Sequence, residues 1–409
     1  METLNWMPPW LPTAGPDGLL VLAAVMVGGA LAGEWIARAT RLPRVVGYTL
    51  AGCVMAVAGM GPKLPLDGTA RLIVDLALAL LLFEIGSRVR LRWLRRNPGL
   101  LATSLTESLL GAVAVFGSLA ALGVAPKVAG ACAVLAVPAS AAVAGRVALE
   151  LGADGQVTQR MTHLTALNTL YGVLILIVFK GWMQAGEAPD LIGALAEVLA
   201  SFSGSLIVAM LLAGAVALVA RRLELRNESA VLLLLGLVLL AVSVARWLGL
   251  STLLVPLLAG LVLRNASDRP WVWPRHFGTA GGVLVLLMFV TVGSAWSVEV
   301  LAAGGAAALA LLVARGTAKG LAVLLFSRWA KASVRQGLAL SVTLLPLSAT
   351  ALVMLSDLVR TVPTLGREVA PIVLSAIAVL ELLGPIAVQA ALRYSGDLAA
   401  TDRKPTEDA

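Results

Sequence analysis

The stretch Leu135-Ala136-Val137-Pro138-Ala139-Ser140-Ala141 decides the fold of this 409-residue chain, together with Leu345-Pro346-Leu347-Ser348-Ala349-Thr350-Ala351. Each lies inside a long apolar segment, where proline removes a backbone donor and clashes with the carbonyl four residues earlier. Each segment is therefore expected to break at its proline. In lipid, the freed backbone groups are tolerated only if they are buried in protein or face water. Two unrelated proline kinks are the alternative explanation.

The composition predicts a membrane protein. Hydrophobic residues make up 59% of the chain and charged residues 13%, and the mean hydropathy is +0.93. These values exclude an ordinary soluble protein. The net charge of +8 does not predict a nucleic-acid partner, because the basic residues lie between apolar segments. Residues 1–17 are polar and lack the basic start of a signal peptide.

The chain contains about thirteen apolar segments, which are the expected membrane helices. Their approximate limits are 18–37, 45–60, 69–87, 99–122, 125–148, 161–183, 190–220, 229–248, 250–263, 278–297, 300–327, 336–356 and 367–392. With the N-terminus outside, 22 basic residues fall in inner loops and 7 in outer loops. By the positive-inside rule, we expect residues 1–17 outside and the tail 393–409 in the cytoplasm.

The two interrupted segments are predicted to have opposite directions across the membrane. An odd number of crossings separates 125–148 from 336–356. Glu107 precedes Pro138 by 31 residues, and Arg315 precedes Pro346 by 31. Interrupted helices at matching positions of two inverted halves indicate the binding site of a secondary transporter.

We therefore predict an all-α polytopic membrane protein with about 13 transmembrane helices. Two inverted six-helix repeats, about 18–183 and 229–392, are joined by a linker helix at about 190–220. Two broken helices are expected to cross at their interruptions. The residues predicted to form this crossing are Pro138, Ser140, Pro346, Ser348 and Thr350.

Two basic residues, Arg315 and Lys319, lie deep inside the segment 300–327 and one turn apart on the same helix face. Insertion scales put the free-energy cost of placing such a charge at the centre of a membrane helix at about 2.5–3.5 kcal/mol. Each of these two residues is therefore expected to have a functional or structural role. Lys319 is expected to neutralise the carbonyl ends of the half-helices, to pair with a carboxylate or to carry a proton itself. Snorkelling to the interface, or a misplaced segment boundary, is the alternative.

Two acidic residues, Glu107 and Glu381, also lie deep in apolar segments with no basic neighbour in the sequence. Each is a candidate for ion or proton movement; the alternative is a protonated side chain that hydrogen-bonds between helices. Three further acids lie beside basic residues and are expected to form ordinary ion pairs: Glu34, Glu84 and Asp75.

The segment 161–183 carries a dense run of polar side chains. Its members are Thr162, His163, Thr165, Asn168, Thr169 and Tyr171. Their oxygens could line the path of a cation, with Asn168 about one-third of the way into the membrane. Alternatively, they hydrogen-bond to the neighbouring broken helix.

Several stretches, in this order and spacing, resemble one known family. They are Arg41–Tyr48, Leu80–Gly86, Leu151–Thr158 with Leu164–Asn168, Arg315–Lys319 and Glu381–Pro385. Together they resemble the bacterial monovalent cation:proton antiporter superfamily, the sodium/hydrogen exchanger-like membrane proteins. The resemblance implies a thirteen-helix fold with inverted repeats, a homodimer and a multi-pass location in the bacterial inner membrane. It also implies that a core domain carrying the crossing moves against a dimerisation domain.

The sequence departs from this family at its centre. In the family, the residue after the asparagine at position 168 is normally an aspartate that binds the cation or the proton. Here that residue is Thr169. A threonine cannot titrate, so a competing carboxylate must come from elsewhere if exchange is retained. Glu107 and Glu381 are the candidates.

The expected function is secondary transport of Na⁺ or K⁺ in exchange for protons by alternating access. One alternative is a carrier of an anion or organic solute, or an uncoupled carrier, with Lys319 and Arg315 as counter-charges. The other is a relative that no longer transports. The expected partners are the cation, H⁺, the lipid bilayer and a second copy of the chain, without nucleic acid. The sequence carries no nucleophile–base set, metal cluster or phosphate loop, so we predict no enzyme activity, no cofactor and no permanently bound metal.

Overall fold

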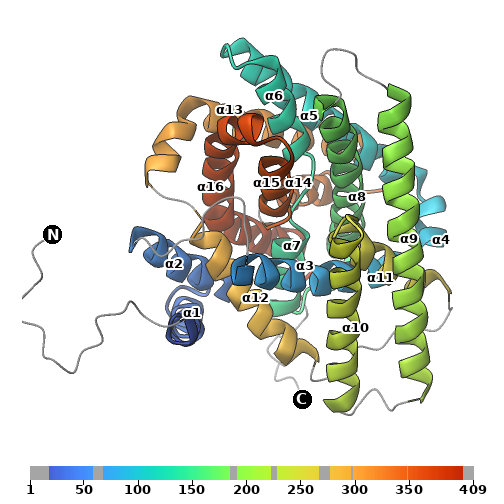
Figure 1. The fold of residues 1–409 in the computed structure, drawn as a ribbon. Coiled ribbons are helices and arrows are strands. Elements are labelled where there is room, and N and C mark those ends of the chain that lie inside the picture. Colours follow the sequence, from blue (N-terminus) through green and yellow to red (C-terminus); the bar gives the residue numbers. More distant parts are fainter. Residues whose placement is uncertain are drawn as a thin grey trace, which may run out of the picture.

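The computed structural model describes residues 18–58, 68–184, 191–222, 228–266, 277–295, 298–347 and 349–398, where every regular element is an α-helix. The helices are α1 (Gly18–Thr40), α2 (Arg44–Val57), α3 (Gly68–Arg88), α4 (Leu91–Arg95), α5 (Pro98–Ala121), α6 (Pro126–Leu135), α7 (Ala141–Glu150), α8 (Gln156–Gln184), α9 (Leu191–Arg222), α10 (Glu228–Trp247), α11 (Leu254–Ala266), α12 (Phe277–Gly293), α13 (Val298–Ser327), α14 (Val334–Thr343), α15 (Ala349–Thr361) and α16 (Pro363–Ser395). Figure 1 shows their arrangement.

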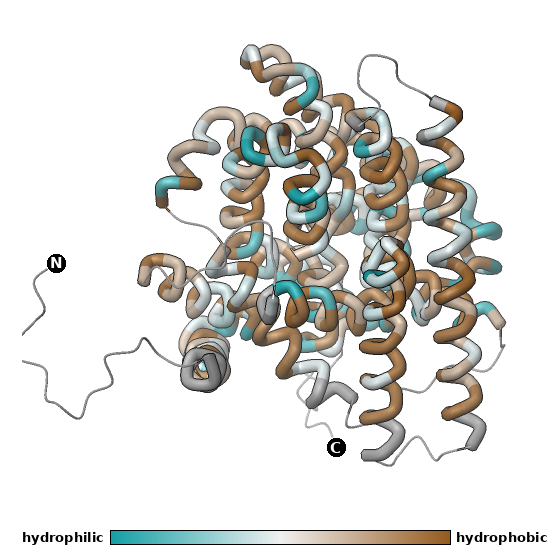
Figure 2. The backbone as a smooth tube through the Cα atoms, viewed as in Figure 1, coloured by the Kyte–Doolittle hydropathy of each residue, from teal (hydrophilic) through white to brown (hydrophobic). Residues whose placement is uncertain are grey.

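These sixteen helices correspond to the thirteen predicted segments, because two segments are broken in two and the short α4 was not predicted. Five helices are long and apolar enough to cross a membrane, namely α5, α8, α9, α13 and α16. Hydrophobic residues run along most of α9 and α10 (Figure 2), and several large apolar side chains on these two helices are exposed. Such surfaces suit contact with lipid.

Apart from the short α4, the helices form two packing groups (Figure 1). The first consists of α5, α6, α7, α8, α13, α14, α15 and α16, and the second of α1, α2, α3, α9, α10, α11 and α12. In the first group, α5 and α13 pack along each other, and α16 packs against α13, α14 and α15. The inverted repeat and the direction of the chain across the membrane stay predictions.

Both broken segments are interrupted at their prolines. The helix α6 ends at Leu135, and α7 begins after Ser140, whose Oγ caps it by accepting a hydrogen bond from the Val143 amide at 3.1 Å. The helix α14 ends at Thr343, and α15 starts at Ala349. Ser348 lies outside the described residues. Each interruption therefore frees the last carbonyls of one half-helix in the middle of the bundle.

Candidate functional site: a crossing of two broken helices

The two interruptions touch each other directly. The Ser140 amide donates a hydrogen bond to the Pro346 carbonyl at 2.8 Å, which joins the unwound segments across more than 200 residues of sequence. A glycine lies against each proline. A Cβ at Gly172 of α8 would lie 2.6 Å from Pro138 Cγ, and one at Gly384 of α16 would lie 3.0 Å from Pro346 Cβ. Each glycine therefore lets its helix approach the proline closely.

Arg315 of α13 holds the free carbonyls of both half-helices. It is 1% exposed. Its guanidinium donates to Ala136 O and Pro138 O, each at 2.8 Å, and to Leu345 O. Longer bonds reach the carbonyls of Leu344 at 3.3 Å and Pro346 at 3.5 Å. A guanidinium has five N–H donors in a planar fork, so one side chain can satisfy carbonyls from both unwound segments of the crossing at once.

Lys319, one turn after Arg315, forms a buried ion pair with Glu107 of α5. Its Nζ also donates to the Val137 carbonyl at 2.9 Å. Both charged side chains are fully buried. Of the three roles expected for Lys319, the structure shows pairing with a carboxylate and a bond to one free carbonyl, and Arg315 bonds to the other carbonyls. The reason is geometric: the guanidinium fork reaches several carbonyls, whereas the ammonium is a point donor.

Hydroxyl and amide groups extend the site from Glu107 to α8. Ser108 Oγ lies 3.4 Å from a Glu107 carboxylate oxygen and donates to Asn168 Oδ1 at 3.1 Å. Ser104 Oγ lies 3.4 Å from the same Asn168 oxygen, and Asn168 Nδ2 has no hydrogen-bond partner among the described residues. Thr169 is buried, and its hydroxyl donates within α8 to Thr165 O at 2.9 Å.

Of the two deep acids, Glu107 is the one paired with Lys319. Glu381 is also buried, on α16, about one turn before the Gly384 that contacts Pro346. Thr350 is buried at the start of α15, with a hydroxyl that has no hydrogen-bond partner within the described ranges. The three predicted ordinary ion pairs are confirmed: Glu34 with Arg38 (2.7 Å) and Arg44 (3.0 Å), Glu84 with Arg88 (2.6 Å), and Asp75 with Arg71 (2.9 Å).

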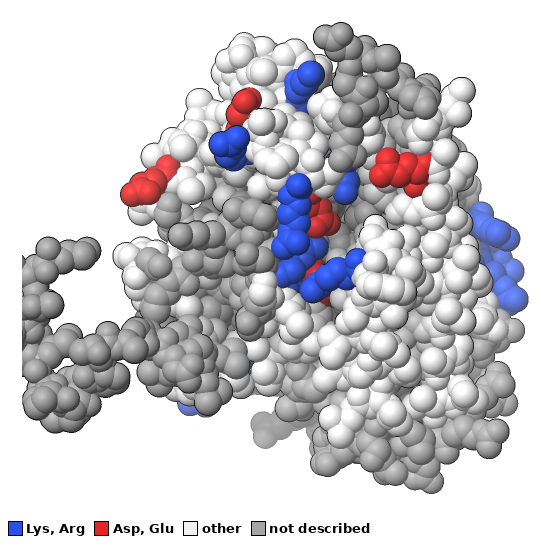
Figure 3. All heavy atoms as spheres, viewed as in Figure 1, with Lys and Arg blue, Asp and Glu red and all other residues white. Residues whose placement is uncertain are grey.

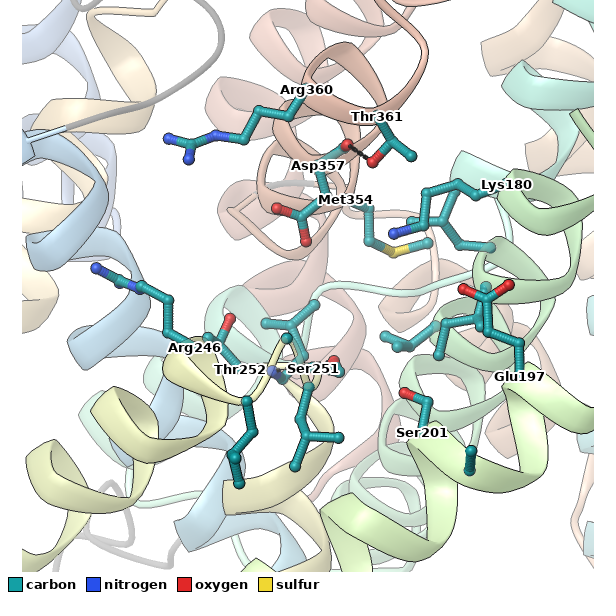
Figure 4. A pocket seen from close by; sticks show the side chains of 18 of the residues that line it. Lys180, Glu197, Ser201, Arg246, Ser251, Thr252, Met354, Asp357, Arg360 and Thr361 are labelled. Carbon is teal, nitrogen blue, oxygen red and sulfur yellow. Dashed lines mark hydrogen bonds between the residues drawn. The ribbon is translucent and has the colours of Figure 1, made fainter. Parts of the chain in front are cut away.

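A cavity of about 700 Å³ opens on the side predicted to face outward. It lies between α8 and α15 on one side and α9 and the α10–α11 turn on the other (Figure 4). Charged side chains of both signs gather around this hollow (Figure 3). Met354 lines the cavity, and its Cε lies 3.6 Å from the position of a Cβ on Gly172, which itself contacts Pro138. The cavity thus reaches within one side chain of the crossing.

Ion pairs at this cavity connect the two packing groups. Arg71 of α3 bonds to Asp75 in its own helix and to Asp357 of α15, both at 2.9 Å. Arg246 of α10 also pairs with Asp75. Because α15 follows the crossing directly, the bond between Arg71 and Asp357 ties the crossing to α3.

On the opposite side of the crossing, the two packing groups are in direct contact. Glu150, the last residue of α7, accepts the Arg44 amide of α2 at 2.9 Å. His163 Nε2 of α8 accepts the Arg90 amide at 3.3 Å. These bonds join the two packing groups on the side that is predicted to face inward.

A comparison with known families gives one match along almost the whole chain. The family described as "Sodium/hydrogen exchanger, transmembrane" matches residues 22–394. The chain belongs to the sodium/hydrogen exchanger family. It is accordingly an integral, multi-pass membrane protein of a transporter family. No curated protein sequence matches it.

Solved structures support this family's fold. A structure of the sodium proton antiporter MjNhaP1 from Methanocaldococcus jannaschii at pH 8 is similar with a TM-score of 0.60 and 16% identity, covering 92% of this chain and 94% of that chain. A structure from an electron-microscopy map of the same antiporter gives a TM-score of 0.67 and 15% identity, covering 96% of this chain and 100% of that chain. At this identity, the likeness concerns the fold alone.

Sequence reasoning missed two members of the site, Ser104 and Ser108. They lie four residues apart around Glu107, so a helix places all three on neighbouring faces. The signal that the sequence offered was the pair of serine hydroxyls at helical spacing around the deeply placed Glu107.

Proposed function

We propose that this protein is a secondary antiporter that exchanges a monovalent cation, Na⁺ or K⁺, for protons by alternating access. Glu107 takes the place of the carboxylate that is missing at Thr169. Family membership supports transport of this class, and MjNhaP1 is itself described as a sodium proton antiporter. The observation that carries the proposal is the buried pair of Glu107 and Lys319 beside the crossing.

This pair offers a chemical basis for competition between a proton and a cation. While Lys319 is protonated, its ammonium occupies Glu107 and the Val137 carbonyl. When Lys319 gives up its proton, that attraction is lost and the oxygens are free to bind a cation. In transporters, unwound carbonyls and half-helix ends coordinate Na⁺ in this way. The Ser108 hydroxyl beside Glu107 supplies a further oxygen.

The cavity and the contacts opposite it support an outward-open arrangement. The cavity approaches Pro138 from the predicted outer side, while Glu150 and His163 bond to the second packing group on the predicted inner side. If the group that contains the crossing moved against the other group, the outer cavity would close and the inner contacts would open. The inner-membrane location, the outer N-terminus, the cytoplasmic C-terminus and a homodimer are parts of this proposal; the orientation follows from the positive-inside rule.

The bonding of the two buried cations does not favour an anion or an organic solute as the substrate. Arg315 donates to five backbone carbonyls, and Lys319 donates to Glu107 and Val137 O. A substrate anion would have to replace these protein oxygens. Binding of a cation at Glu107 requires only that Lys319 lose one proton.

The test is proton flux in proteoliposomes on addition of Na⁺, K⁺ or Li⁺. Wild type is expected to show cation-dependent flux, and Glu107→Gln and Lys319→Ala are expected to abolish it. Glu84→Gln, which removes an acid from an ion pair near the predicted inner end of α3, is the matched control and should retain flux. Glu381→Gln separates the two candidate acids and should also retain flux.

Two outcomes would overturn the proposal. Full activity of Glu107→Gln with loss of activity in Glu381→Gln would assign the competing carboxylate to α16. An inactive wild type together with an active Thr169→Asp would mean that the fold is intact and that exchange has been given up.

A further inference from the structure

A second cavity, of about 270 Å³, lies at the start of α8 on the side predicted to face the cytoplasm. Its lining residues are Trp93, Asn97, Gln156, Gln159, Arg160 and Lys331. They come from α4, the residue before α5, the first turns of α8 and the turn after α13. Two are cationic, three are amides, and none of these described lining residues is acidic. We propose that this cavity is a binding site for a phosphate group.

Arg160 is the main reason for this assignment. Arg160 is only 7% exposed, and its Nη2 donates a hydrogen bond to the Lys331 carbonyl at 3.1 Å. Its Nη1 has no hydrogen-bond partner in the part of the chain that the structure describes, and no carboxylate there forms an ion pair with it. A buried guanidinium without a counter-ion is costly, and a bound anion would offset that cost.

One of the acids at this end of α8, Asp397, is hydrogen-bonded to the helix. Asp397 accepts the Thr158 amide at 2.8 Å and the Thr158 hydroxyl at 3.0 Å, so it caps the helix. The Thr158 amide is therefore not a source of anion affinity. That affinity comes from the side chains: the planar Arg160 fork matches phosphate oxygens, Lys331 adds a point charge, and the amides of Asn97, Gln156 and Gln159 can donate hydrogen bonds.

The surroundings of the cavity attract anions. The helix α4, which contributes Trp93, also carries exposed Arg92 and Arg95, and exposed Arg96 follows it. Figure 3 shows basic side chains at the edge of the molecule where α4 lies. Such a basic surface concentrates free phosphates and the anionic headgroups of a membrane alike. The chemistry recognised is the phosphate group, whether it is free or part of a lipid.

The experiment uses the purified full-length chain in a detergent without phosphate. Thermal unfolding is followed while Tris phosphate replaces Tris chloride at constant pH and ionic strength, and separately while phosphatidylglycerol is added. We expect one of these additions to raise the unfolding temperature in a saturable manner. Arg160→Gln and Lys331→Gln should each weaken the apparent affinity about tenfold, the worth of one charge-assisted hydrogen bond.

Arg328→Gln is the matched control, because Arg328 is exposed on the same turn and does not line the cavity. It removes the same charge and should leave the response unchanged. Saturation by Tris phosphate assigns free phosphate, and saturation by phosphatidylglycerol alone assigns the lipid headgroup. The proposal is overturned if neither addition stabilises the wild type, or if Arg328→Gln weakens the response as much as Lys331→Gln. Lys331 is exposed, so its variant keeps the test decisive even if Arg160→Gln does not fold.

Discussion

Glu107 and Lys319 are separated by 212 residues in the sequence and form an ion pair with both side chains fully buried. The pair lies where α5 packs along α13, and Lys319 reaches the unwound Val137 carbonyl from there. We propose that Glu107 of α5 serves in place of the carboxylate that the family resemblance places on α8.

The first prediction concerns stability. Lys319→Met leaves the Glu107 carboxylate buried without its partner, and Glu107→Gln does the same to the ammonium, so each should lower the free energy of unfolding by about 3–5 kcal/mol. The double variant should recover most of that loss, because neither member of the pair then leaves the other's charge buried without its partner. Thermal unfolding in detergent measures the cycle.

The control for this cycle is Arg88→Met, which breaks the partly exposed pair with Glu84. Its effect should stay within about 1 kcal/mol. Losses in the double variant equal to the sum of the single losses would show that the two charges do not depend on each other.

The second prediction concerns the charge moved per cycle. If a cation replaces the Lys319 proton at Glu107, the net charge of the site is the same in both states. One proton should then leave for each cation that enters, and exchange should be electroneutral. Proton flux in proteoliposomes with and without an imposed membrane potential checks this: equal rates are expected, and a rate that follows the potential contradicts the one-for-one replacement.

The third prediction tests the role of Arg315. Arg315→Lys keeps the charge but has three donors in place of five, and it lacks the planar fork that reaches both half-helices. Each carbonyl left without a partner should cost about 1–3 kcal/mol. The variant should therefore be clearly less stable than wild type in thermal unfolding. Wild-type stability would mean that Arg315 acts through its charge alone.

The fourth prediction tests the contact between α8 and the crossing. A Cβ at Gly172 would lie 2.6 Å from the Pro138 ring, so Gly172→Ala should destabilise the protein by about 1–3 kcal/mol and reduce exchange. Gly214→Ala on α9 is the control, because nothing lies within 4 Å of its added Cβ. It should be neutral or stabilise by up to about 1 kcal/mol. Equal effects of the two variants would contradict close packing at Pro138.

The sequence by itself determined the class of protein and the positions of its unusual features. Hydropathy and charge are local properties, so they predicted the membrane helices and the deep placement of Arg315, Lys319 and Glu107. The breaks at Pro138 and Pro346 followed from the covalent chemistry of proline, which acts on its own turn of helix whatever the surroundings.

The tertiary structure alone decided which of these features meet. Hydropathy made Glu107 and Glu381 equally good candidates for the competing carboxylate. Only the packing of α5 along α13 brings Glu107 into an ion pair with Lys319. The same packing places Arg315 within hydrogen-bonding distance of carbonyls from both half-helices, and it places Ser108 within hydrogen-bonding distance of Asn168. These bonds depend on distances between helices that lie far apart in the chain. Each helix keeps the same apolar pattern whichever neighbour it packs against, so the pattern cannot specify the partner.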